Sequence, residues 1–146
     1  MTPDPAVLVL NGGSSSIKFA LYQTGDPPKQ GLHGKVDRIG LSGTTFTFDD
    51  PAEKQHGDQR LDQSDRRSAA MFLFDWLESR VGLASIAAIG HRVVNGGSNY
   101  LEAQLVTDDM LDELRRISAY APEHLPRAVI PAIRRAKTVC CATNIL

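Results

Sequence analysis

The opening of the chain holds the pattern that most restricts its fold. Residues 7–10 form a short apolar run, which is typical of a buried strand. The next six residues, NGGSSS, are all turn formers. Residues 17–22 then alternate, with Ile17, Phe19 and Leu21 on one side of an extended chain. We therefore predict a β-hairpin whose two strands are joined by a loop rich in glycine and serine.

The rest of the chain predicts helices mixed with further strands. In chain order, we expect strands at 31–39 and 44–49, a charged loop at 50–61, a helix capped by Ser64 or Asp65 and ended by Gly82, a strand at 86–89, helices from Thr107 and at 127–137, and a strand-like segment from 138. The centre of the first helix is apolar nearly all round, so we expect most of it to be buried. This order of elements indicates an α/β or α+β domain.

Composition narrows the class of protein. The formal net charge of -1 gives no general attraction for nucleic acid or an anionic membrane surface. No apolar run approaches the ~20 residues of a membrane-spanning helix, and the first residues lack the basic region of a signal peptide. The two cysteines, Cys140 and Cys141, are neighbours and form no framework of spaced disulfides. We expect a cytoplasmic protein without nucleic-acid or membrane partners.

The hairpin loop concentrates groups that suit a phosphate. Its two glycines let the backbone approach a ligand closely, and Ser14 and Ser16 supply hydroxyl groups. Lys18 adds a positive charge, and the Asn11 carboxamide oxygen could bind a metal ion or its water shell. The loop lacks the Walker A pattern, and a strand follows it, so no helix dipole contributes. The residues alone favour the alternative of an ordinary hairpin turn with a solvated lysine, since loops of this composition are common.

A second motif, GHRVVNGG, follows the predicted strand at 86–89. Arg92 could bind a carboxylate through its planar pair of donors, and Val94 could present an apolar wall to a short alkyl chain. A solvated or ion-paired arginine is the alternative, and His91 suits a hydrogen bond near the core better than catalysis. In a third motif, APEHLP, two prolines bracket His124, which could donate to a phosphoryl oxygen or cap a helix end.

These motifs carry a family resemblance. The segment VLVLNGGSSSIKFALY resembles the opening of acetate kinases, members of the sugar kinase, actin and Hsp70 superfamily, in which this hairpin faces the nucleotide phosphates. GHRVVNGG resembles the segment whose arginine binds the substrate carboxylate, and APEHLP resembles an APLHNP-like segment of the active-site cleft. The chain departs from the family at Asn95, where a histidine is usual, and at Glu123 and Leu125.

The resemblance implies a fold and an activity. The fold is a ribonuclease-H-like (actin-like ATPase) domain with an opening β-hairpin and a mixed sheet packed by helices. The activity is the transfer of phosphate from ATP to acetate, with Mg²⁺, by cytoplasmic homodimers. By the same resemblance, Ser14, Ser16 and Lys18 bind the ATP phosphates, Asn11 lies at the metal, Arg92 and Val94 bind the substrate, and His124 lies in the cleft.

The resemblance also predicts the domain content of the chain. Residues 1–146 match the amino-terminal domain, and the family's catalytic aspartate would lie beyond Leu146, with the carboxy-terminal nucleotide domain absent. We therefore expect these residues alone to be inactive. The alternatives are a non-catalytic remnant that binds phosphate and carboxylate, a pseudogene product that hardly folds, and a fragment of a propionate or butyrate kinase, since one methylene changes binding by only ~1–3 kcal/mol.

Overall fold

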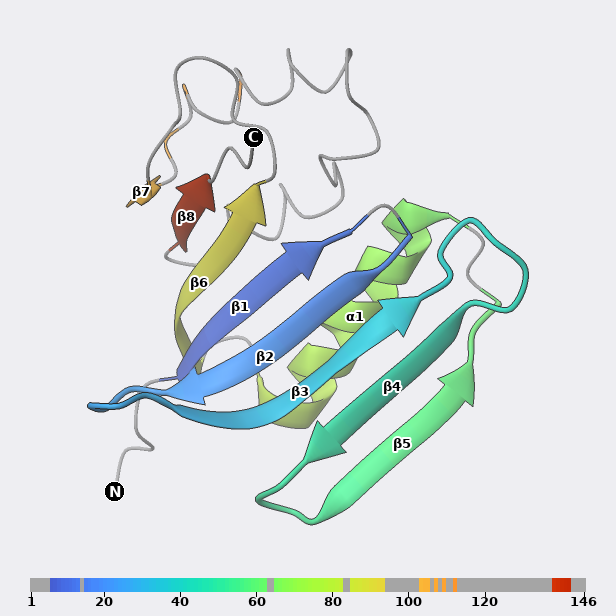
Figure 1. Ribbon diagram of the computed structural model, residues 1–146, viewed down its shortest axis with the longest axis horizontal. Helices are drawn as coiled ribbons and strands as arrows, with labels where there is room; N and C mark the ends of the chain where they lie inside the picture. The colour runs from blue at the N-terminus through green and yellow to red at the C-terminus, as the bar shows by residue number, and fades with distance from the viewer. Residues whose placement is uncertain are drawn as a thin grey trace.

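The described part of the chain is one mixed sheet with a helix on one face (Figure 1). The computed structural model describes residues 6–13, 15–62, 65–82, 85–93, 103–105, 107, 109, 112 and 138–142. The sheet has eight strands in the order β5-β4-β3-β2-β1-β6-β8-β7. Strand β1 therefore lies inside the sheet, with a neighbour on either side.

The first four strands form an antiparallel meander. They are β1 (Ala6–Gly12), β2 (Ile17–Gln23), β3 (Lys29–Asp37) and β4 (Thr45–Asp50). The predicted hairpin is confirmed, because β1 pairs antiparallel with β2 from Ala6↔Gln23 to Gly12↔Ile17. The predicted alternation is confirmed as well, since Ile17, Phe19 and Leu21 are all buried.

Parallel pairing begins on the other side of β1. Strand β6 (Ile86–Val93) pairs in parallel with β1, and β8 (Thr138–Ala142) pairs in parallel with β6. The short strand β7 (Ala103–Leu105), which the sequence analysis did not predict, pairs antiparallel with β8. The segments predicted as helices from Thr107 and at 127–137 lie almost wholly outside the described residues, although Asp109 and Asp112 are helical.

The prediction of a loop at 50–61 was wrong. Residues Gln55–Arg60 form strand β5, which pairs antiparallel with β4 from Thr45↔Arg60 to Asp50↔Gln55. This strand has no buried side chain, so its sequence, QHGDQR, carries none of the apolar alternation that identifies a strand with one face in the core. Backbone pairing with β4 forms this strand, although no pattern of its side chains predicts it.

Helix α1 (Arg66–Val81) packs across the sheet and forms the core with it. Both predicted ends are confirmed. The Asp65 side chain accepts the Ser68 backbone N–H at 2.9 Å, and Gly82 ends the helix with a φ of 73°, a positive value that favours glycine. As expected, most of the helix centre is buried or partly buried, although Met71 on the outer face is 55% exposed. No helix in the described part of the chain is long and apolar enough to cross a membrane.

Aromatic rings fill the space between α1 and the sheet. The Trp76 ring centroid lies 4.9 Å from that of Phe46 and 5.8 Å from that of Phe19. The guanidinium of Arg80 lies 4.8 Å from the Phe48 ring centroid and donates from Nη2 to Asp50 Oδ2 at 3.0 Å. This charge pair links the last turn of α1 to the end of β4. It is shielded from water, since Asp50 is only 8% exposed.

Replacing Arg80 by methionine is expected to lower the free energy of unfolding by about 3 kcal/mol, because it leaves the Asp50 carboxylate buried without its cation. Thermal or urea unfolding followed by circular dichroism measures this. The double variant Asp50→Asn/Arg80→Met is expected to recover part of the loss, since no charge is left behind. Equal losses in the single and double variants would contradict the role given to the charge pair.

Candidate functional site

The hairpin loop between β1 and β2 is closed by its own backbone. The Gly13 N–H donates to the Ser16 carbonyl at 2.9 Å. A methyl group on Gly13 would lie 2.8 Å from Ser16 Oγ, closer than carbon and oxygen normally approach. Glycine therefore lets the Ser16 hydroxyl lie against the backbone of the loop. Ser14, at the centre of the loop, lies outside the described residues.

The structure brings Asn11 and Lys18 together at the base of this loop. They are direct partners in the β1–β2 register. Because Ile17 and Phe19 are buried toward α1, the alternation of β2 directs Lys18 to the opposite face of the sheet. Asn11 and Lys18 both line an open hollow of about 510 Å³ on that face. A carboxamide oxygen and an ammonium group thus share one surface beside a loop of serines.

The register extends this pair into a row across the sheet. Lys35 of β3 is the partner of Lys18, and Arg92 of β6 is the partner of Asn11. Neighbouring strands lie about 4.8 Å apart, so the backbone positions of Lys18 and Arg92, two strands apart, are separated by roughly 10 Å. Residues 18 and 92 are distant in the sequence, and parallel pairing of β1 with β6 places their backbones at this spacing.

The charges in the hollow are unequally paired. Lys35 Nζ donates to Asp37 Oδ2 at 3.0 Å, and this hydrogen bond, with that from the Arg38 backbone N–H, holds the pKa of the Asp37 carboxyl below its usual range. His33 Nε2 lies 3.9 Å from Asp49 Oδ2. Among the described residues, no carboxylate lies within ion-pair distance of Lys18, which is exposed. Among the side chains that the structure describes in the hollow, Lys18 therefore carries the charge best placed to meet an anion.

The metal-binding capacity of the described residues is small. No three His, Cys, Asp or Glu side chains of this part of the chain come together as a metal-binding group. Asn11, with its neutral oxygen, is the predicted contact. Such a ligand fits Mg²⁺ where water and substrate phosphates complete the coordination, which is the usual arrangement for this ion.

Several predicted site residues cannot be compared with the structure. Val94 and His124 lie outside the described residues, as does Ser14. Arg92 is described as a backbone position in β6 and through its pairing with Asn11 and Cys141. The roles of Lys18, Asn11, Ser16 and Arg92 stay predictions, although the structure shows that their backbones meet at one end of β1, β2 and β6.

Sequence reasoning missed the neighbours of the loop on β3. Lys35 is the partner of Lys18 in the register and donates to Asp37, and Ile39, just beyond the end of β3, donates its backbone N–H to the Ser15 carbonyl at 2.8 Å. The alternation of charge at 35 and 37 was the available signal, because residues two apart on a strand share a face. What the sequence does not contain is the register that sets Lys35 opposite Lys18.

The chain is similar to acetate and propionate kinases. The acetokinase family model matches residues 6–145. A propionate kinase of Citrobacter rodentium is 36% identical over 125 residues, which cover 82% of this chain and 30% of the relative. An acetate kinase of Bacillus cereus is 35% identical over 128 residues, which cover 85% of this chain and 31% of the relative. The chain thus spans about 30% of the length of the curated relatives it matches.

Solved structures carry the same fold. The crystal structure of Porphyromonas gingivalis acetate kinase matches with a TM-score of 0.74 and 25% identity, covering 94% of this chain and 37% of that one. A propionate kinase from Francisella tularensis matches with a TM-score of 0.75 and 28% identity, covering 94% and 36%. The predicted actin-like ATPase fold, with an opening hairpin and a mixed sheet, is confirmed for the part of the fold present here. With its opening hairpin, its mixed sheet and a family match from residue 6 to 145, the chain belongs to the acetokinase family.

Proposed function

We propose that this chain supplies the phosphate-facing hairpin and the carboxylate-binding arginine of an acetate kinase-type phosphotransferase. The reaction is ATP + acetate ⇌ ADP + acetyl phosphate. The observation that carries the proposal is the pairing of Asn11 with both Lys18 and Arg92 in adjacent strands. Lys18 is predicted to bind phosphate and Arg92 to bind carboxylate. The two residues therefore lie on the two strands that flank Asn11.

Each group has a defined task in this reaction. Phosphoryl transfer depends on positioning and on neutralising charge at the moving phosphoryl group. Lys18, Ser14 and Ser16 bind the terminal phosphates, and Arg92 holds the acceptor carboxylate in a bidentate grip beside Val94. His124 belongs to the same cleft. Mg²⁺, when bound, neutralises charge on the phosphate oxygens, and Asn11 is the residue of this chain that would contact it or its water shell.

The domain content of the chain follows from the same proposal. Residues 1–146 correspond to an amino-terminal domain, and the family's catalytic aspartate and nucleotide-binding domain are not among them. The proposal is supported by the span of about 30% of the relatives' length. The complete protein is proposed to be a cytoplasmic homodimer, a setting in which ATP is available and the neighbouring cysteines stay reduced.

A second acceptor is supported by a specific observation. Propionate kinases are among the relatives, at 36% identity in two species of Citrobacter. Acetate and propionate differ by one methylene, which an apolar pocket distinguishes by only ~1–3 kcal/mol. The carboxylate contact at Arg92 serves either acid, so the two candidates share this part of the site. A non-catalytic module that retains phosphate binding is the alternative from another class, and turnover separates it from the kinases.

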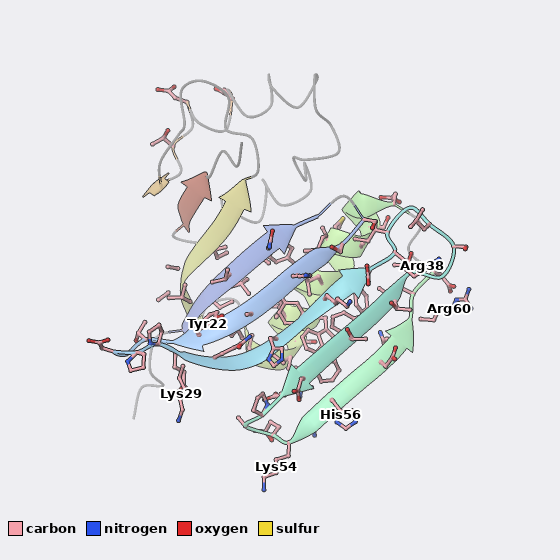
Figure 2. The ribbon with its side chains drawn as sticks, viewed as in Figure 1. Tyr22, Lys29, Arg38, Lys54, His56 and Arg60 are labelled. Atoms are coloured by element: carbon pink, nitrogen blue, oxygen red, sulfur yellow. The ribbon has the colours of Figure 1, made fainter. Side chains whose placement is uncertain are left out.

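The phosphate role of Lys18 can be tested on the chain itself. Titration of residues 1–146 with Mg·ATP and with tripolyphosphate, followed by calorimetry or ³¹P NMR, is expected to show binding that Lys18→Met weakens at least about 10-fold, because a hydrogen bond to a charged group contributes about 1.5–3 kcal/mol. Lys29→Met is the matched control, since Lys29 lies at the far end of the sheet (Figure 2). Equal affinities for Lys18→Met and the native chain would refute the phosphate role.

A further inference from the structure

The connection between β3 and β4 is tied to the phosphate-facing loop by the backbone. Residues 38–44 form this connection, and Figure 2 shows Arg38 at its start, in the same region as Arg60. The Ile39 N–H donates to the Ser15 carbonyl at 2.8 Å, and the Ile39 side chain is buried in the core at 6% exposed. A residue fixed in the core therefore holds one carbonyl of the NGGSSS loop.

Arg38 adopts a conformation that its surroundings must maintain. Its φ is 60°, in the left-handed region that non-glycine residues rarely adopt and that costs energy there. Asp37 Oδ1 accepts the Arg38 N–H at 2.9 Å. The Arg38 carbonyl accepts from Thr44 Oγ1 at 3.1 Å and from the Leu41 N–H at 3.1 Å. Thr44 is a firm anchor, since it is only 3% exposed.

Two peptide planes transmit this orientation to the loop. In a trans peptide, the carbonyl and the following N–H point in opposite directions. Thr44 fixes the Arg38 carbonyl, and so directs the Ile39 N–H toward Ser15. Ile39 in turn fixes the Ser15 carbonyl toward the β3–β4 connection, and the planar Ser15–Ser16 peptide so directs the Ser16 N–H away from that connection.

The direction of these groups matters to an anion. A carbonyl oxygen that faced the loop mouth would repel phosphate, whereas a backbone N–H there binds it. Glycines leave the loop backbone free to adopt either orientation, at an entropic cost when it is fixed. A loop that is already fixed binds its ligand without that cost.

We propose that Thr44 and Asp37 are positioning residues for phosphate binding. They hold Arg38 in its left-handed turn, and the turn orients the Ser15–Ser16 peptide so that its N–H, and not its carbonyl, serves the anion. The inference rests on the proposed function, because it takes the phosphate to bind at the NGGSSS loop. It adds residues that touch no ligand and act through the backbone.

The test compares isosteric variants of the 146-residue chain. Thr44→Val removes the donor and keeps the shape, whereas Thr44→Ser keeps the donor. Calorimetric titration with tripolyphosphate, well below the unfolding temperature, is expected to give about fivefold weaker binding for Thr44→Val, the loss typical of one hydrogen bond, and native affinity for Thr44→Ser. Amide hydrogen exchange at Ile39 should accelerate in Thr44→Val and stay protected in Thr44→Ser.

Asp37, whose side chain is only partly buried, provides a second test for the case in which Thr44→Val fails to fold. Asp37→Ala and Asp37→Asn both remove the negative charge beside Lys35, but only asparagine keeps an oxygen for the Arg38 N–H. Their difference therefore isolates the turn, and we expect Asp37→Ala to bind tripolyphosphate several-fold more weakly than Asp37→Asn. Equal affinities in this pair would overturn the inference.

The outcomes separate this inference from the proposed function. If the native chain binds tripolyphosphate and Lys18→Met does not, unchanged affinity in Thr44→Val would overturn the positioning role alone. A lowered melting temperature with native affinity would mean that the connection serves only stability, and would overturn it too. If the native chain itself does not bind tripolyphosphate, the phosphate role of the loop is refuted, and the positioning role is refuted with it.

Discussion

Residues 1–146 alone are expected to form no acetyl phosphate, whereas a chimera in which residues 6–145 replace the matching segment of the Bacillus cereus acetate kinase is expected to be active. The match between this chain and that relative spans 128 residues, which make up 31% of the relative, so the chimera supplies the remainder of the cleft. Removing one transition-state donor typically costs about 10²–10³ in rate, and the isolated chain is proposed to lack several, including the catalytic aspartate. Trapping acetyl phosphate as its hydroxamate measures both activities.

Within the chimera, Arg92→Leu is expected to raise the KM for acetate about 100-fold, because two hydrogen bonds to the carboxylate are lost at about 1.5 kcal/mol or more each. Arg92→Lys keeps the charge but not the planar fork, so it should fall between the native chimera and Arg92→Leu. Circular dichroism confirms that each variant is folded. An unchanged acetate KM in Arg92→Leu would exclude the carboxylate role, and turnover by the isolated chain would exclude the proposed domain content.

Gly34→Ala is expected to lower the free energy of unfolding by about 3 kcal/mol, at the upper end of the cost of overpacking. A methyl group there would meet the Thr47 carbonyl oxygen and would lie 2.9 Å from both Phe19 Cε1 and Phe48 Cα. Two of these atoms belong to the backbone of β4, so no side-chain rotation relieves the contact and β3 must move away from β4. The melting temperature should fall by about 10 °C for a chain of this size.

The same strand offers a matched control for this substitution. A methyl group on Gly31 would come no nearer than 3.7 Å to its closest neighbour, the Leu21 carbonyl oxygen, which is an ordinary contact. Gly31→Ala should therefore change the melting temperature little. Similar melting temperatures for the two variants would show that the separation of β3 and β4 is more adaptable than the structure indicates.

Local signals in the sequence were enough to predict the hairpin and helix α1. The hairpin follows from apolar alternation on either side of a loop of turn formers, and α1 from an aspartate cap and a terminal glycine. Strand β5 was not predicted because none of its side chains is buried, so its sequence shows no alternation of apolar and polar residues. The sequence predicted that most of the α1 centre is buried but not which side stays exposed, because an apolar composition does not tell which face the sheet will cover.

The site was predictable to the extent that it is local. Once a hairpin is assumed, Asn11 and Lys18 must lie near each other, because the loop between them is short. The position of Arg92 beside Asn11 depends on parallel pairing between distant segments, which the residues themselves do not specify. The family resemblance assigned a site role to each of the two residues but predicted no pairing of their strands. The support from Thr44 and Asp37 had no sequence signal, since it depends on a register and a left-handed turn.

The polar strand at the outer side of the sheet has a consequence for assembly. An outermost strand presents unpaired backbone groups that can recruit a strand from another molecule, and nature blocks this with short or charged edges. Strand β5 exposes a histidine, an aspartate and an arginine along six residues, and the opposite border, β7, is only three residues long. Both borders therefore disfavour growth of the sheet from one molecule into the next. For the described residues, contacts between copies are therefore expected at a face of the sheet, at the outer side of α1 or at the loops.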